Sequence, residues 1–399
     1  MLKSYMRDKN MGTYSTVFAL SIVFICVNFL GRGNLFAVAA LVLNTALLLW
    51  KRGEFEFDLN CLYGILFIVG GVFAAGLFFD AFEAIKSVNV LAAYLVGYWG
   101  YKQYETEKEK AQFIKLIAFS AFLGFSAYLI ATFIFNELAP WKVNRCLYNV
   151  WGENYEMVSV TLIGMVSSVV IGYSFYAFFF QRNLFLRIYT GIALIIALLL
   201  NVKTSTRTPL LLFVIVYAFM FVLSLGKLKK RTQTAVWISF GVIVAVVATV
   251  LLTNVFGIRD ALMSIPLVKR LLLEGLSTPR VEEYIAHFNN MPNRILGGLW
   301  QKYEVGNYAH NFLQDAYDCY GVLALLSMLG YSVLFIINAF KLVFGKNKTS
   351  VEYLLISMQA AMLIQLCLEP IFSGYPILMW MVMLLHGGTT ARLEERESK

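Results

Sequence analysis

Charged residues are scarce in this sequence. Asp, Glu, Lys and Arg make up 14% of the 399 residues, whereas a soluble globular chain carries roughly 25%. Hydrophobic residues make up 59% and aromatic residues 16%, and they gather in many segments long enough to cross a bilayer, with charges between them. The composition excludes a soluble globular protein and a lone signal peptide, and it predicts an all-α, polytopic membrane protein.

Cysteine is also scarce, and its spacing follows no motif. None of the five cysteines lies in a C-x-x-C or other metal-binding pattern, which excludes a zinc site built on cysteines and gives no sign of a disulfide framework. We interpret four of them as ordinary membrane-helix residues and Cys146 as a free thiol in a loop. The other four are Cys26, Cys61, Cys319 and Cys367.

Basic residues outnumber acidic ones, giving a formal net charge of +9. They lie in short clusters beside apolar segments, the pattern that sets the orientation of a membrane protein, so no nucleic-acid partner is expected.

The hydropathy pattern predicts a single integral membrane domain over residues 1–399, with about twelve transmembrane helices of about 20 residues each. A large extracytoplasmic loop with short helices is expected at 257–310 and a cytoplasmic tail at 387–399. The predicted spans are Thr13–Leu30, Leu35–Trp50, Leu59–Phe79, Val88–Trp99, Phe113–Phe135, Met157–Phe180, Ile188–Val202, Pro209–Gly226, Ala235–Phe256, Asn311–Phe340, Val351–Pro370 and Tyr375–His386.

The basic clusters occupy alternate loops, beginning with the N-terminus. The positive-inside rule makes these loops and both termini cytoplasmic. The segments 136–156, 203–209 and 257–310 then share the extracytoplasmic face. A mixed-sign run at 102–110 is interpreted as a solvated loop.

Two arginines lie beside predicted helix starts on that face. Thr208-Pro209 follows Arg207, and Thr278-Pro279 precedes Arg280; each pair is typical of an N-cap followed by proline in the first turn. Unsatisfied amide hydrogens at a helix start favour an anion, and guanidinium groups bind phosphate oxygens in a bidentate way. The two segments therefore indicate a bound phosphate or pyrophosphate.

His310 is one of only three histidines in the chain. A neutral imidazole can take a proton from a sugar hydroxyl at physiological pH. Asn311, Asp315 and Asp318 follow on one helical face, as candidate substrate-binding residues. The first outward loop lacks the D-x-D motif that metal-dependent membrane glycosyltransferases usually carry, so neither a metal nor another cofactor is expected.

Other residues are weaker candidates. Lys203 and Arg294 are possible substrate-binding residues, and Glu369 could line the cavity. His287 is expected on the surface of the loop, and His386 at the cytoplasmic end of the last span. Structural interpretations also stay open: Arg207 as an interfacial residue, Arg280 as an ordinary loop residue, and His310-Asn311 as a helix-capping pair.

Four segments together resemble the O-antigen ligase and polymerase family. They are T-S-T-R-T-P-L-L-L-F at 204–213, S-T-P-R at 277–280, I-L-G-G at 295–298 and Y-A-H-N-F-L-Q-D-A-Y-D-C-Y-G-V-L-A-L-L at 308–326. The family pattern is an arginine at a mid-chain span, a large loop with a second arginine, a glycine-rich turn, and H-N with a glycine eleven residues after the histidine. The motifs cover about 204–326, and the first half of the chain matches only in hydropathy.

The resemblance implies a metal-independent, inverting glycosyltransferase of a bacterial inner membrane. Its donor would be an undecaprenyl-pyrophosphate-linked glycan, and its acceptor a second glycan or lipid A core. Arg207 and Arg280 would bind the pyrophosphate, His310 would act as the base and Asn311 would orient the site. Membrane lipids and a chain-length regulator are the further partners implied.

Three alternatives stay open. Ligases often carry a second histidine two residues before this one, where this chain has Tyr308; the difference slightly favours a repeat-unit polymerase over an O-antigen ligase. A lipid-linked oligosaccharide flippase or other transporter would also have many spans, but we find no similarity between the two halves of the chain, and the candidate charges gather on one face. The third alternative is a structural subunit of an export complex.

Overall fold

The computed structural model describes residues 13–52, 56–78, 81–138, 147–152, 156–225, 280–298, 308–345 and 348–398, with isolated residues between 230 and 268. The predicted span 235–256, Cys146 and most of the predicted loop 257–310 lie outside these ranges.

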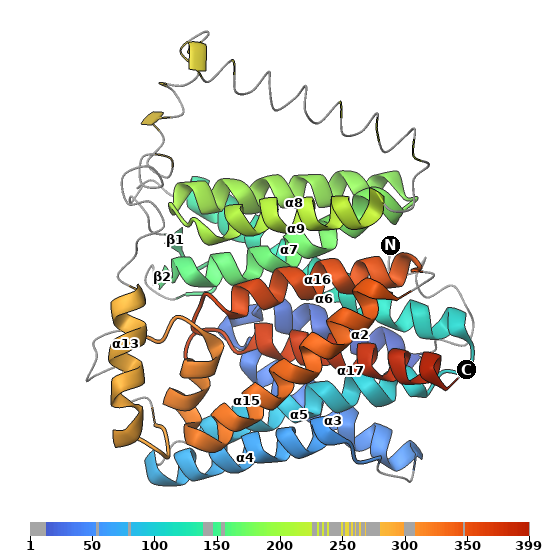
Figure 1. The fold of residues 1–399 in the computed structure, drawn as a ribbon, viewed down its shortest axis with the longest axis vertical. Helices are drawn as coiled ribbons and strands as arrows, with labels where there is room; N and C mark the ends of the chain where they lie inside the picture. The colour runs from blue at the N-terminus through green and yellow to red at the C-terminus, as the bar shows by residue number, and fades with distance from the viewer. Residues whose placement is uncertain are drawn as a thin grey trace.

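The described chain is almost entirely helical (Figure 1). The first eight helices are α2 (Thr13–Cys26), α3 (Gly33–Arg52), α4 (Leu59–Phe78), α5 (Ala81–Lys102), α6 (Glu107–Leu138), α7 (Val160–Phe180), α8 (Leu184–Lys203) and α9 (Thr208–Leu225). The others are α13 (Arg280–Asn290), α15 (Phe312–Phe344), α16 (Ser350–Leu366) and α17 (Ile377–Glu397). The described residues also form two 3₁₀ helices, η1 (Phe29–Gly31) and η3 (Met291–Asn293), and a small antiparallel pair, β1 (Leu147–Tyr148) and β2 (Met157–Val158).

Seven of the described helices are long and apolar enough to cross a membrane: α3, α4, α6, α7, α8, α9 and α15. Helices α2 and α16 contain shorter apolar stretches. The prediction of an all-α membrane protein is therefore confirmed at this level, and the count of twelve spans stays a prediction.

Helices α5 and α17 pack very closely in the middle of the bundle. A Cβ atom added to Gly97 would lie 2.0 Å from the carbonyl oxygen of Leu384, and one added to Gly387 would lie 2.1 Å from that of Tyr94. Small residues allow two membrane helices to approach in this way. Helix α4 also packs extensively against both α15 and α5, and α7 packs against α16.

The structure differs from the sequence prediction at the C-terminus. The last helix was predicted to end at about His386, but α17 continues to Glu397, and its residues up to Leu393 are buried. Ion pairs hold its charged last turns to the bundle. They are Arg392–Glu352 at 2.6 Å, Arg396–Glu352 at 2.7 Å, Lys110–Glu395 at 2.6 Å, Lys341–Glu397 at 2.7 Å and Lys102–Glu394 at 3.3 Å.

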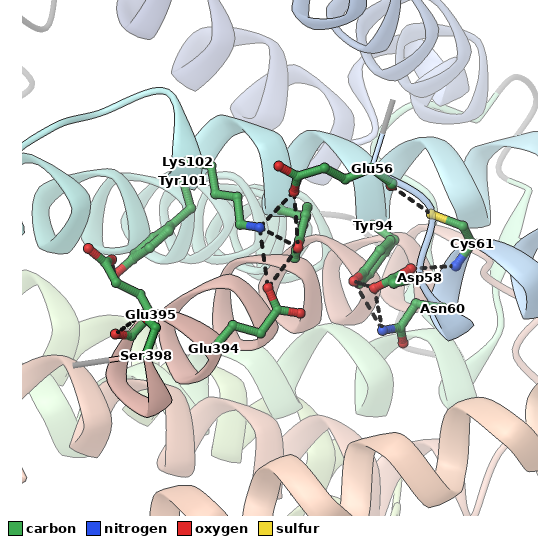
Figure 2. Close-up of polar contacts among 11 residues, drawn as sticks. Glu56, Asp58, Asn60, Cys61, Tyr94, Tyr101, Lys102, Glu394, Glu395 and Ser398 are labelled. Carbon is green, nitrogen blue, oxygen red and sulfur yellow. Dashed lines mark hydrogen bonds and ion pairs between the residues drawn. The ribbon is translucent and has the colours of Figure 1, made fainter. Parts of the chain in front are cut away.

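The mixed-sign run at 102–110 is also more ordered than a solvated loop. Only residues 103–106 join α5 to α6. Figure 2 shows Lys102 between Glu56 and Glu394, with its Nζ atom 2.7 Å from Oε2 of Glu56. The charges of this run therefore help to close one end of the bundle.

Helix α15 is broken at Gly321. The backbone there has φ 77° and ψ −166°, which a residue with a side chain rarely adopts. The segment 295–298 fills the break, because the amide of Gly298 donates to the carbonyl of Asp318 at 2.8 Å and the amide of Val322 donates to that of Ile295 at 2.9 Å. The glycine-rich turn and the glycine eleven residues after His310 thus contact each other and separate the start of α15 from the rest of the helix.

Candidate functional site

The candidate residues lie at one end of the bundle, which we call the α13 end. It contains α13, residues 308–311 before α15, the loop 367–376 after α16 and the turn 204–207 between α8 and α9. In Figure 1, α13 and the β1–β2 pair lie on the left, whereas α17 ends on the right. We call that opposite side the α17 end.

His310 lies directly before α15, and Asn311 caps the helix. The Asn311 side chain accepts a hydrogen bond from the amide of Gln314 at 2.9 Å, with Asn311 itself in an extended conformation. The cap fixes where the helix begins, and therefore where the preceding histidine is held. The capping interpretation of Asn311 is confirmed, and it leaves the imidazole of His310 available for another role.

Two carboxylates flank the imidazole of His310, one beside each ring nitrogen. Oε2 of Glu369 lies 3.5 Å from Nδ1, and Oε2 of Glu283 lies 3.7 Å from Nε2. The Glu369 side chain is 1% exposed, against 17% for Glu283 and 19% for His310. Both separations exceed ordinary hydrogen-bond length, so the ring lies near both acids at the distance of a loose ion pair.

Helix α13 brings Glu283 to this position. The Tyr284 hydroxyl donates to the carbonyl oxygen of His310 at 2.7 Å, and the Gln314 side chain donates to the carbonyl of Tyr284 at 3.1 Å. Further along, the Tyr317 hydroxyl donates to the carbonyl of Met291. These contacts align α13 with the first half of α15.

His287 is buried, which corrects the expectation that it lies on the surface. Its side chain is fully buried, and its Nδ1 atom lies 2.9 Å from Oδ2 of Asp318. The apolar residues of the same helix, Val281, Ile285 and Phe288, are instead exposed. The helix therefore turns its polar side toward α15 and its apolar side outward.

Asp315 and Asp318, which we predicted to bind substrate, both contact other parts of the chain. The buried Asp315 carboxylate accepts hydrogen bonds from the amides of Phe372 and Ser373 and from the Ser373 hydroxyl. It therefore satisfies backbone groups of the largely buried loop 367–376, which would otherwise lack partners. That loop carries Glu369, so Asp315 indirectly supports the environment of His310.

Arg207 follows a tight turn at the same end. Ser205 has φ 55°, and the hydroxyls of Thr204 and Thr206 lie 2.8 Å apart. A Cβ atom added to Gly164 would lie 3.3 Å from both Pro209 and the Gln365 side chain, so the start of α9 packs beside the end of α16. Gln365 lies four residues before Glu369. The turn and the loop bearing Glu369 are thus neighbours.

The remaining predicted residues are placed as follows. Lys203 forms an ion pair with Glu137 at 2.6 Å, which joins the ends of α8 and α6. Arg280 is the first residue of α13, and its side chain is outside the described part of the structure. Arg294 caps the end of η3. The start of α9, directly after Arg207, and the start of α13 at Arg280 both belong to the α13 end.

Sequence reasoning missed Glu283 entirely and gave Glu369 only a minor place. Glu283 stands three residues after Arg280, in the first turn of α13, where acidic residues are common for helix stability alone. Glu369 stands before a proline, which signals only a helix end. No sequence pattern places either of them beside His310, because they come from segments 86 residues apart.

The arrangement is suited to proton transfer. A histidine with a buried carboxylate beside one nitrogen can accept a proton at the other, because the carboxylate stabilises the imidazolium that forms. Within the described part of the chain, no three His, Cys, Asp or Glu side chains are arranged to hold a metal ion; metal independence stays a prediction. A comparison with protein families finds no match, and a comparison with curated proteins finds no similar sequence.

Proposed function

We propose that this protein is a metal-independent, inverting glycosyltransferase that polymerises undecaprenyl-pyrophosphate-linked oligosaccharide repeat units. The observation that supports the proposal most strongly is His310, held between Glu369 and Glu283 with Arg280 starting the same helix as Glu283. The order of motifs at 204–326 is the second support.

In the proposed reaction, His310 takes the proton of an acceptor sugar hydroxyl. The resulting oxygen attacks the anomeric carbon of the donor, and the bond from that carbon to the pyrophosphate oxygen breaks. Arg207 and Arg280 neutralise the departing pyrophosphate, and Glu369 stabilises the imidazolium of His310. Nucleophile and leaving group lie on opposite faces of the sugar, which gives inversion.

The proposal includes a topology. About twelve spans place both termini in the cytoplasm and the α13 end on the extracytoplasmic side of a bacterial inner membrane. Basic residues at the α17 end, such as Lys102, Lys110 and Arg396, agree with the positive-inside rule.

The test is transfer in reconstituted membranes with a lipid-pyrophosphate glycan as donor, comparing the wild-type protein with His310→Ala. We expect a ladder of lengthening lipid-linked chains from the wild type, undiminished by excess chelator, and a loss of about 10²- to 10⁴-fold in the variant. Lys341→Ala, an exposed change at the α17 end, is the control and should keep the ladder.

Three other outcomes would contradict the proposal. A single transfer that requires added lipid A core would identify a ligase. Movement of the donor across the bilayer without any new glycosidic bond would identify a transporter. Full activity of His310→Ala would remove this histidine from the mechanism.

A further inference from the structure

Helix α13 has unusually little apolar attachment to the bundle. His287 is its only fully buried residue in the described part of the helix, which runs from Val281 to Asn290. Its large apolar side chains point away, with Val281 61%, Ile285 55% and Phe288 66% exposed. Among the described residues, hydrophobic burial therefore contributes little to holding α13 in place, and polar contacts attach it to α15.

The His287–Asp318 contact is the most deeply buried of these polar contacts. The side chains are 0% and 7% exposed, and their 2.9 Å separation is that of a hydrogen bond. The contacts that Tyr284 and Glu283 of this helix make with the start of α15 involve partly exposed side chains. Loss of one member of a buried polar pair leaves its partner unsatisfied, which is more costly than loss of an exposed hydrogen bond.

Asp318 holds the returning chain at a second point. Its carbonyl oxygen accepts the amide of Gly298 at 2.8 Å, beside the break in α15. The carboxylate and the carbonyl of one residue thus bind both ends of the segment 287–298. The position of α13 is coupled through Asp318 to the broken helix that begins beside His310.

We propose that His287 and Asp318 are a positioning pair, which fixes α13 on the first half of α15 and thereby holds Glu283 and the helix start at Arg280 beside His310. The effect on transfer rests on the proposed function, whereas the effect on the position of α13 does not. Both residues act through α13.

The experiment uses the full chain in lipid nanodiscs and three variants. His287→Leu removes the N–H group that donates to Asp318, and His287→Asn keeps an N–H group at about the position of Nδ1. Asn289→Ala changes an exposed residue of the same helix. Amide hydrogen exchange is measured over 281–290, with α16 as the internal reference.

We expect His287→Leu to accelerate exchange in α13 by about tenfold or more without changing α16, because local opening becomes easier. His287→Asn and Asn289→Ala should stay within about threefold of the wild type. Unchanged exchange in His287→Leu would overturn the proposal. If His287→Leu does not insert in the membrane, Asp318→Asn replaces it, and we expect an acceleration of more than about threefold, beyond the range of the two control variants; a rate within that range would overturn the proposal equally.

Kinetics supply the second readout. With the lipid-pyrophosphate glycan as donor, we expect His287→Leu to raise KM for the donor and lower kcat, for a combined loss of about 10- to 100-fold in kcat/KM. His287→Asn should restore most of it, and the shape of the pH–rate profile should not change, because His310 stays the base. Full activity of His287→Leu despite faster exchange would remove the positioning role. Absence of transfer by the wild type would instead overturn the proposed function and leave the exchange result to decide the position of α13.

Discussion

The ion pairs of Glu352 at the α17 end differ from the surroundings of His310 at the α13 end. At the α17 end, Arg392 lies 2.6 Å and Arg396 2.7 Å from the same carboxylate oxygen of Glu352. At the α13 end, His310 lies 3.5 Å and 3.7 Å from its two carboxylates. Short, buried pairs fix a structure, because separating them exposes an unpaired buried charge. The longer separations around His310 leave its ring nitrogens able to accept a proton and a hydrogen bond from a bound substrate, as the proposed reaction requires.

The largest loss of stability is expected when the ion pairs of Glu352 with Arg392 and Arg396 at the α17 end are broken. Glu352 is 1% and Arg392 6% exposed, so Glu352→Ala should destabilise the protein by about 3–5 kcal/mol. The measurement is the unfolding midpoint in mixed micelles. The control is Lys341→Ala, whose ion pair with Glu397 is 43% and 58% exposed and whose loss should change stability by less than about 1 kcal/mol. Equal losses in the two variants would mean that burial does not distinguish these pairs.

The break in α15 should be the next most sensitive point. Gly321→Ala introduces a Cβ atom 2.5 Å from the carbonyl oxygen of Ile295, at φ 77°. We expect a loss of about 1–3 kcal/mol from the backbone strain, seen as a lower unfolding midpoint and as faster hydrogen exchange in 294–298.

Gly76→Ala in α4 is the matched control, because an added Cβ there meets no atom within 4 Å. It should be neutral or stabilising by up to about 1 kcal/mol. An unaffected Gly321→Ala would show that α15 can continue without its break.

At the α13 end, the two carboxylates beside His310 should differ in effect. Glu369→Gln should lower kcat by about 10- to 100-fold, because the buried carboxylate stabilises the imidazolium. Glu283→Gln should lower it by less, about 3- to 10-fold, because that side chain is more exposed. Rates of chain extension at saturating donor provide the measurement, and the reverse order would assign the stabilising role to Glu283.

The smallest effect concerns Asp58, just before α4 at the α17 end. Burial alone would raise the pKa of Asp58, but hydrogen bonds from Tyr94, Asn60 and the amide of Cys61 outweigh it and bring the pKa below its ordinary value (Figure 2). The folded protein therefore binds this proton more weakly than the unfolded chain does. The stabilisation is present above the ordinary aspartate pKa and is lost as the pH falls through the lower folded value. We expect the unfolding midpoint of the wild type to fall below about pH 4 more steeply than that of Asp58→Asn; parallel curves would contradict this assignment.

Sequence alone determined the parts of the fold that depend on local patterns. Long apolar segments need no partner to be recognised, so α3, α4, α7 and α9 were predicted within a few residues of their ends. Asn311 was expected as a possible helix cap, and Thr208-Pro209 as a helix start, because capping depends on adjacent residues. Both ends of α5 and α6 and the last turns of α17 extend beyond the predicted spans, because hydropathy stops at charged residues, whereas in the folded chain many of these residues are paired with other segments.

Only the tertiary structure decided which residues surround His310 and how α13 is attached. The side chains of Glu283 and Glu369 come from distant segments, and the histidine lies between them only after α13 and the loop 367–376 have packed against α15. His287 looked like a surface residue because apolar neighbours flank it, yet in a membrane protein the apolar side of a short helix can face outward and the polar side inward. Hydropathy identifies the segments that leave water, but the pairing of polar groups inside the bundle depends on distances that no local pattern contains.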